Sequence, residues 1–317
     1  MFTLALGLAL AFALTNGLQG ASNAIAGLVV TRAARALPAA LLAAVFNLLG
    51  TLLLGAAIAD TVGGIVTGGG VGVIAAGLAA AVAFSLVTWS RALPASSGHA
   101  LVGGLVGAAL AAGASVHWAS VAEILVALAI FPPLGLLAGL GLIRGLRFSG
   151  RRATRRWRGP VRGAEWATSA ALAFGYGAND ASKSVGVIAA LLVADGRATT
   201  LGSPAWAAIT CALALTCGTT LGGWAIARTI GRGIVRLHPL DGVAEQTASA
   251  GVLVCASALG APVSTTQVVA SAIVGVGVGR RRLRHVRWRI VRAMGLGWVV
   301  TLPVTAALGF VLALVLA

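Results

Sequence analysis

The sequence has very few charged residues. Only 9% of its 317 residues are Asp, Glu, Lys or Arg, and seven of these are acids and one is a lysine. A soluble domain has about 25% charged residues, whereas 59% of this chain is apolar. The shortage of charge excludes an ordinary water-soluble fold and predicts a membrane protein.

Long polar stretches, paired cysteines and enzyme motifs are also missing. A transmembrane helix takes about 20 residues, so the 317 residues have room for about ten spans and no separate soluble domain. The three cysteines lie in apolar stretches without metal-ligand spacing, which favours small buried hydrophobic side chains. No zinc signature, phosphate-binding glycine loop or nucleophile motif is present. We therefore expect neither an enzyme nor a cofactor.

The positive charge is concentrated in two places. The net charge is +16, and 15 of the 22 arginines lie in residues 144–162 and 280–292. Arginine clusters between apolar runs are typical of cytoplasmic loops that face anionic lipid. The pattern therefore predicts membrane lipid rather than nucleic acid as the partner of these arginines.

Apolar runs bounded by Arg, Pro and Gly predict an all-α polytopic protein with about ten membrane elements. The Arg-rich segment 144–165 is the one long polar connection, and it is expected to be a cytoplasmic loop between residues 1–143 and 166–317. The elements are expected near 2–31, 37–59, 71–90, 93–114, 119–143, 166–193, 203–226, 243–259, 260–279 and 294–317.

The two halves resemble each other, which indicates an internal duplication. Three blocks recur in the same order and at similar spacing. With five crossings in each half, the two copies would have opposite orientations, as in many secondary transporters. The matched blocks are 17–24 with 177–184, 59–66 with 227–235, and 93–99 with 261–267.

The positive-inside rule predicts the sidedness of the chain. Both Arg-rich stretches, together with Arg32, Arg35 and Arg91, should be cytoplasmic. Both termini then lie outside the cell, and the protein is a multi-pass component of the plasma membrane.

The first pair of blocks places polar residues within apolar helices. A charge at the bilayer centre costs about 2.5–3.5 kcal/mol on insertion scales. The presence of Asp180 and Lys183 in an apolar helix therefore requires a structural or functional explanation. At i, i+3 spacing they can pair on one helix face. One interpretation is an ion pair that only joins the halves. The other makes Asp180 a cation or proton site and Lys183 a counter-charge or an anion contact.

The block around Pro94 and its counterpart around Pro262 combine proline with a run of hydroxyls. Proline cannot continue a helix, so each predicts a break followed by a new helix N-terminus. Such an end with nearby hydroxyls can bind an oxyanion, although helix capping and packing would explain either block alone. The duplication favours a tetrahedral-anion site formed by both. The hydroxyls are those of Ser96, Ser97, Ser264, Thr265 and Thr266.

These residues resemble the PiT family of inorganic phosphate transporters, which are sodium- or proton-coupled symporters. The resemblance runs nearly end to end and implies an inverted-repeat transporter with no bound cofactor. It implies that the five hydroxyls contact phosphate and that Asn16, Asn23, Asn179 and Asp180 lie near the coupling cation. The matching stretches are Asn16–Gly17 through Asn23–Ala26, Gly177–Ala181, Gly222–Trp224 and Pro262–Thr266.

One position departs from the family. The first motif of PiT proteins usually has an Asp where this chain has Gly20, and Lys183 stands opposite Asn23. Compared with a sodium site built from two carboxylates, the two motifs therefore lack one negative charge, at residue 20, and carry one positive charge, at Lys183. The departure favours proton coupling over sodium, or a lysine charge in place of one cation, and leaves Asn179 and Asp180 as the remaining place for a sodium ion.

The expected function is phosphate uptake by cation-coupled symport with alternating access. A sulfate or other tetrahedral-oxyanion permease is the nearest alternative. A non-transporting membrane subunit or a passive channel is the alternative of another class. The oligomeric state is open, a homodimer included.

Overall fold

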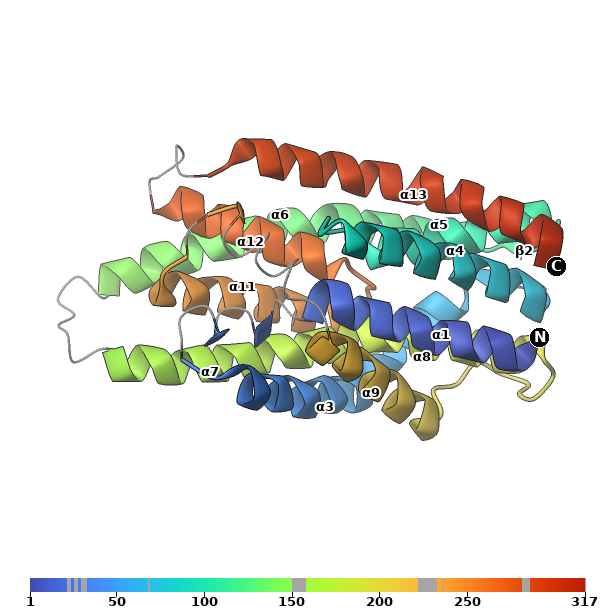
Figure 1. The fold of residues 1–317 in the computed structure, drawn as a ribbon, viewed down its shortest axis with the longest axis horizontal. Helices are drawn as coiled ribbons and strands as arrows, with labels where there is room; N and C mark the ends of the chain where they lie inside the picture. The colour runs from blue at the N-terminus through green and yellow to red at the C-terminus, as the bar shows by residue number, and fades with distance from the viewer. Residues whose placement is uncertain are drawn as a thin grey trace.

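The protein is a long bundle of helices, as its apolar composition predicts (Figure 1). The computed structural model describes residues 1–21, 24–25, 28–29, 33–67, 69–149, 158–221, 233–235, 237–280 and 286–316. In the first half the elements are α1 (Phe2–Asn16), η1 (Gly17–Ala21), α3 (Ala36–Gly63), β1 (Val66–Thr67), α4 (Val71–Ser90), α5 (Ser97–Ala111), β2 (Ser115–Val116) and α6 (Trp118–Ser149). In the second half they are α7 (Arg158–Tyr176), η4 (Gly177–Ala181), α8 (Ser182–Ala194), α9 (Ala205–Leu221), α11 (Pro239–Ala258), α12 (Thr265–Gly279) and α13 (Trp288–Leu316).

The outer surface of the bundle is apolar, which confirms an all-α polytopic membrane protein. Within the described residues, five helical segments are long and apolar enough to cross a membrane. Leu296 and Val299 on α13 are about 70% exposed, at 69% and 73%. Exposed aliphatic side chains along a helix face are expected where the solvent is lipid rather than water.

Helices α4 and α5 form a hairpin rather than the two separate crossings expected from residues 71–90 and 93–114. A Cβ built at Gly77 of α4 would lie 2.8 Å from the Leu105 backbone of α5. The 15 residues of α5 span about 22 Å, less than the roughly 30 Å hydrocarbon core. The connecting tip, with Pro94, lines a cavity with Met294 and Thr301 of α13. The tip therefore lies well inside the length of the bundle, and Arg91 stands beside it rather than at the end with the clustered arginines.

Helices α11 and α12 form a second hairpin, which enters from the opposite end (Figure 1). A Cβ built at Gly175 of α7 would contact Leu253 of α11, and a Cβ built at Gly139 of α6 would contact the backbone of Ala272 in α12. Helices α7 and α6 therefore pack closely against this hairpin. Within the described residues, each half thus contains one hairpin in place of two of the expected crossings. The two hairpins point in opposite directions along the bundle (Figure 1).

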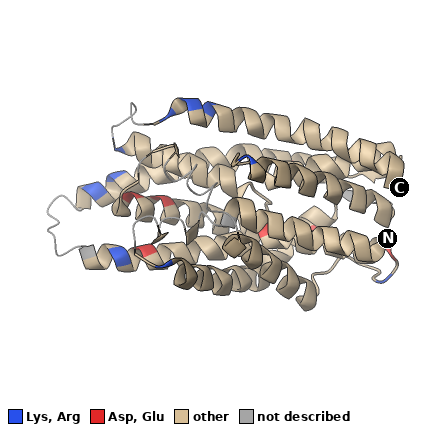
Figure 2. Cartoon of the chain, viewed as in Figure 1, with Lys and Arg blue, Asp and Glu red and all other residues tan. Residues whose placement is uncertain are grey.

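The ends of the bundle differ in charge. Both chain termini lie at one end in Figure 1, and most of the Lys and Arg residues drawn in Figure 2 gather at the other. Helix α6 continues to Ser149 and α7 begins at Arg158, so helices extend into both sides of the segment 144–165 that we expected to be a loop. Arginine has a high helix propensity, which explains why the polar composition did not end these helices.

The first helix of each half changes its winding at equivalent positions. Helix α1 runs to Asn16 and continues as the five-residue π-helical turn η1. The described residues 24–25 and 28–29 are again helical, which agrees with the element expected near 2–31. Helix α7 is followed by a π-helical turn of the same length, η4. The aligned blocks begin at Gly17 and Gly177, the first residues of these turns. π-Helical turns are rare and often occur at functional sites.

Candidate functional site

A buried ion pair lies at the centre of the second half. Asp180 is in the turn η4 and Lys183 is in the first turn of α8, and each is 1% exposed. Lys183 Nζ is 2.8 Å from Asp180 Oδ1. The i, i+3 spacing thus brings the two side chains together, as the sequence predicted. Because a buried charge is stable only when it is paired and hydrogen-bonded, each residue accounts for the burial of the other.

The pair is connected to the tip of the second hairpin. Lys183 Nζ donates a hydrogen bond to the backbone oxygen of Val263 over 2.5 Å. Thr265 donates its hydroxyl to Asp180 Oδ2 over 2.7 Å. Asn179 Oδ1 accepts from the Val263 N–H at 3.2 Å, and its Nδ2 donates to the Ala261 oxygen at 3.3 Å. The polar side chains of η4 and α8 therefore hold the break between α11 and α12 in place.

The first half reaches the same pair through α1 and η1. Asn16 Nδ2 donates to the backbone oxygen of Asp180 over 3.4 Å. Asn16 Oδ1 is buried and has no hydrogen-bond partner within the described part of the chain. A Cβ built at Gly20 would lie 3.5 Å from Asp180 Oδ2 and 3.4 Å from Thr265 Oγ1. An Asp at residue 20 would therefore bring a second carboxylate beside that of Asp180.

The two hairpin tips approach each other in the middle of the bundle. A Cβ built at Gly98, in the first turn of α5, would lie 4.0 Å from the Val263 oxygen at the second tip. Helices α5 and α12 both begin at these tips, so their free N–H groups and positive dipole ends are there. All five hydroxyl residues are buried: Ser96, Ser97, Ser264, Thr265 and Thr266.

The two N-cap serines differ in their partners. Ser96 Oγ accepts from the His99 N–H at 3.3 Å and lies 2.6 Å from His99 Nδ1. Ser264 is the N-cap of α12 but makes no capping bond through its side chain. Among the described residues its hydroxyl has no hydrogen-bond partner. A buried hydroxyl without a partner at a helix N-terminus is available to an oxyanion.

Three buried amides near the site were not assigned to it by the sequence interpretation, although two of them lie in the matched blocks 17–24 and 261–267. Gln267 Oε1, in the first turn of α12, and Gln19 Oε1 of η1 have no partner within the described residues. Neither side-chain polar atom of Asn47 on α3 has one there either. Asn47 could have been noticed as the lone amide in the apolar run 37–59. Asn23 and the Gly222–Trp224 motif lie outside the described residues.

The site offers oxygen ligands rather than a transition-metal cluster. The described residues contain no group of three or more His, Cys, Asp or Glu side chains placed to hold a metal ion. Carboxylate, amide and backbone oxygens are present, and these suit hard cations. In the structure, however, the ammonium group of Lys183 already contacts two of these oxygens, Asp180 Oδ1 and the Val263 carbonyl.

Comparison with known proteins shows the family of the chain. The model of the phosphate transporter family matches residues 16–164 and 151–309. A probable low-affinity inorganic phosphate transporter of Rhizobium meliloti is 39% identical, over 94% of this chain and 91% of the relative. A protein of the same description from Bacillus subtilis is 36% identical, over 95% of this chain and 92% of the relative.

A solved structure has the same fold. It is described as the sodium-dependent phosphate transporter and superposes with a TM-score of 0.87. The match covers 99% of this chain and 98% of that one at 22% sequence identity. At this identity the likeness extends to the architecture of helices and hairpins, and the chemistry of the site must be argued from this chain's own residues.

Proposed function

The chain belongs to the phosphate transporter family, and from this membership we propose that it imports inorganic phosphate across the plasma membrane. The hydroxyls of Ser96, Ser97, Ser264, Thr265 and Thr266 and the N-termini of α5 and α12 form the anion site. Asn16, Asn179 and Asp180 form the cation side of the same centre, and Asn23 is assigned to it from the sequence motif alone. Lys183 connects Asp180 with the second hairpin tip.

Proton coupling, rather than sodium coupling, is the second part of the proposal. The observation that carries it is the position of the Lys183 ammonium, 2.8 Å from Asp180 Oδ1 and 2.5 Å from the Val263 oxygen. A carboxylate and a backbone carbonyl are the ligands that a sodium ion would need. The ammonium group of Lys183 thus takes the place of a bound cation. Because residue 20 is glycine, it supplies no second carboxylate to balance the charge of a sodium ion beside the ammonium. A proton that binds or leaves Asp180 or Lys183 can change the charge of this pair where sodium cannot enter.

Alternating access would follow from the opposed hairpins. The α4–α5 and α11–α12 hairpins enter from opposite ends of the bundle (Figure 1). If the halves are inverted repeats, rocking one against the other opens the central site to each side in turn. The N–H of Val263 binds Asn179 Oδ1 and its oxygen binds Lys183. A change in charge at the pair therefore reaches the second hairpin tip directly.

Purified protein in proteoliposomes tests the coupling. A proton gradient, acidic outside, should drive accumulation of labelled phosphate above its equilibrium level, and an inward sodium gradient at equal pH should not. Accumulation driven by sodium alone, or uptake indifferent to both gradients, would contradict the proposal. Competition by unlabelled phosphate and arsenate, but not by sulfate, would separate phosphate transport from a sulfate permease.

A paired substitution tests the role of the tethered cation. Gly20→Asp combined with Lys183→Asn exchanges the positive charge for a second carboxylate beside Asp180. Uptake by this variant should become stimulated by sodium. The matched control is Gly20→Asp alone, in which the ammonium remains and sodium should have no effect. A correctly folded double variant that still ignores sodium would show that Lys183 does not stand in for the cation.

A further inference from the structure

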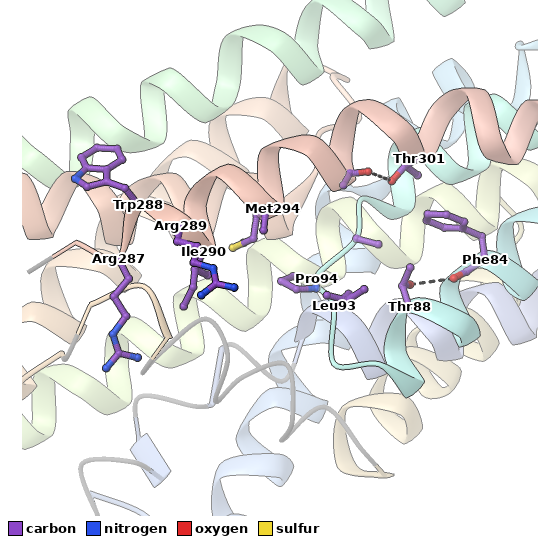
Figure 3. A pocket seen from close by; sticks show the side chains of 13 residues that line it. Phe84, Thr88, Leu93, Pro94, Arg287, Trp288, Arg289, Ile290, Met294 and Thr301 are labelled. Carbon is purple, nitrogen blue, oxygen red and sulfur yellow. Dashed lines mark hydrogen bonds between the residues drawn. The ribbon is translucent and has the colours of Figure 1, made fainter.

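A cavity of about 750 Å³ lies between the tip of the first hairpin and the first half of α13 (Figure 3). This volume is within the usual range for ligand pockets, roughly 300–1,000 Å³. Its walls are mainly apolar: Phe84, Leu93 and Pro94 come from α4 and the tip, and Ile290 and Met294 come from α13. In Figure 3, Pro94 lies beside Met294 across the cavity. Such walls fit a hydrocarbon chain and offer no ligands to a phosphate ion.

The charge at the cavity is confined to the start of α13. Arg287 and Arg289 line the cavity there, next to Trp288. In Figure 3 the Arg289 guanidinium extends from α13 toward Pro94, and the Arg287 guanidinium lies farther from the hairpin tip. Neither arginine takes part in an ion pair with any acid of the described chain. Both belong to the second Arg-rich stretch and are exposed. Unpaired guanidinium groups at the edge of an apolar cavity suit a ligand with one phosphate group and a long apolar tail.

We propose that this cavity is a binding site for one anionic phospholipid. Its phosphate group binds Arg287 and Arg289, and an acyl chain lies along Phe84, Leu93, Pro94 and Met294. The cavity is next to the exposed apolar face of α13 that carries Leu296 and Val299, so a lipid can enter from the surrounding bilayer. The indole of Trp288 suits the boundary between headgroup and chain.

The position of the site connects the lipid to the transport centre. Ala95 lines the cavity and is followed directly by Ser96, the N-cap of α5, and by Ser97. An acyl chain against Leu93 and Pro94 would support the tip that holds these hydroxyls. The proposal does not depend on which ion is coupled, because it rests on a different set of residues.

Tryptophan quenching can measure binding at this site. Delipidated protein in detergent is titrated with phosphatidylglycerol carrying brominated acyl chains, which quench a nearby indole. We expect saturable quenching that is lost in Trp288→Phe. Phosphatidylcholine with the same brominated chains, which has no net charge, should quench only weakly. Equal quenching by both lipids would overturn the proposal, since the cavity would then take any lipid.

Two substitutions separate the headgroup from the chain. Arg287→Gln with Arg289→Gln should weaken phosphatidylglycerol binding about 30-fold, since each basic residue near anionic lipid contributes roughly a fivefold factor. The matched control, Arg162→Gln with Arg292→Gln, removes two exposed arginines that do not line the cavity and should leave binding unchanged. Ala293→Phe fills the apolar part and should abolish the quenching.

Two further outcomes would assign the cavity to something else. Displacement of the lipid by millimolar inorganic phosphate would mean that the arginines belong to the transport pathway. A dimer that dissociates in Ala293→Phe, together with unchanged lipid quenching, would make this face an interface between two copies of the chain. Either result overturns the lipid site, and a single symmetric peak in size-exclusion chromatography together with an unchanged helical circular-dichroism spectrum shows that each variant is folded.

Discussion

At the scale of single residues, the centre depends on the Asp180–Lys183 pair. Both side chains are 1% exposed, and the pair has three further hydrogen-bonded neighbours: the Val263 oxygen, the Thr265 hydroxyl and Asn16. Breaking such a pair by removing one partner typically costs about 3–5 kcal/mol, because the other charge is left buried alone. A structural role and a coupling role therefore both predict a damaged single variant, and two variants are needed to separate them.

We predict that Asp180→Asn abolishes concentrative phosphate uptake, and that Asp180→Asn combined with Lys183→Met does so as well. The double variant removes both charges and should recover the thermal stability lost in the single one. Accumulation in proteoliposomes and unfolding temperature in detergent are the measurements.

The matched control for this prediction is Asp60→Asn, which changes an exposed Asp on α3 and should leave uptake intact. If the double variant regained wild-type accumulation along with its stability, the pair would be only a structural link between elements.

At the scale of elements, the two hairpin tips differ in how their N-cap serines are used. Ser96 caps α5 and contacts His99, whereas the Ser264 hydroxyl has no partner within the described chain. Loss of a capping hydroxyl costs about 1 kcal/mol, and loss of an unpartnered one costs less.

We therefore predict that Ser96→Ala lowers the unfolding free energy by about 1 kcal/mol, and that Ser264→Ala leaves stability nearly unchanged but raises the KM for phosphate. Thermal unfolding and initial uptake rates measure the two effects. The opposite pattern would mean that Ser264 serves the fold and not the anion.

Reciprocal glycine contacts join the π-helical turns to the second long helix of the other half. A Cβ at Gly177 would collide with the Asn47 oxygen of α3, and a Cβ at Gly17 would collide with the Leu215 oxygen of α9. Both contacts bring backbone against backbone, so neither neighbour can move aside cheaply. The pattern is the same in both halves, which supports the duplication inferred from the sequence blocks.

We predict that Gly17→Ala and Gly177→Ala each destabilise the protein by about 1–3 kcal/mol through overpacking. The control is Gly141→Ala on α6, where an added Cβ meets nothing within 4 Å. Unfolding temperature in detergent measures the difference. Equal behaviour of all three variants would show that the helices can separate at these points without cost.

At the scale of the whole molecule, the arrangement predicts a fixed orientation in the membrane. Both termini lie at one end and most basic residues at the other (Figure 2). Cytoplasmic loops carry the excess of Lys and Arg. The end with the arginines should therefore face the cytoplasm.

Single cysteines test this orientation in a background with Cys211, Cys217 and Cys255 replaced by Ala. Ala112→Cys, at the exposed end of α5, should react with a membrane-impermeant maleimide on intact cells. Arg162→Cys, exposed near the start of α7, should react only after the membrane is opened. Labelling of Arg162→Cys on intact cells would reverse the predicted sidedness.

The sequence by itself determined the membrane class, most helix positions and the residues of the central pair. Scarce charge and long apolar runs leave few alternatives to helices in lipid, and an isolated Asp with Lys at i, i+3 spacing must pair. It also predicted the breaks at Pro94 and Pro262, where a proline is followed by a run of hydroxyls. Proline alone does not decide where a helix ends, because Pro132 and Pro133 lie inside α6 and Pro303 lies inside α13.

Tertiary structure decided how these elements meet. An apolar run of 15–20 residues reads the same whether it crosses the bilayer or returns as a hairpin, so the two hairpins were counted as crossings. The contact of Lys183 with the Val263 oxygen and the position of Gly20 beside Asp180 bring together residues far apart in the chain. Local sequence pattern carries no signal for such distances. Packing placed the lone lysine against Asp180 Oδ1 and the Val263 oxygen, which we propose as the place of a coupling cation. Packing likewise opened the apolar cavity beside Arg287 and Arg289.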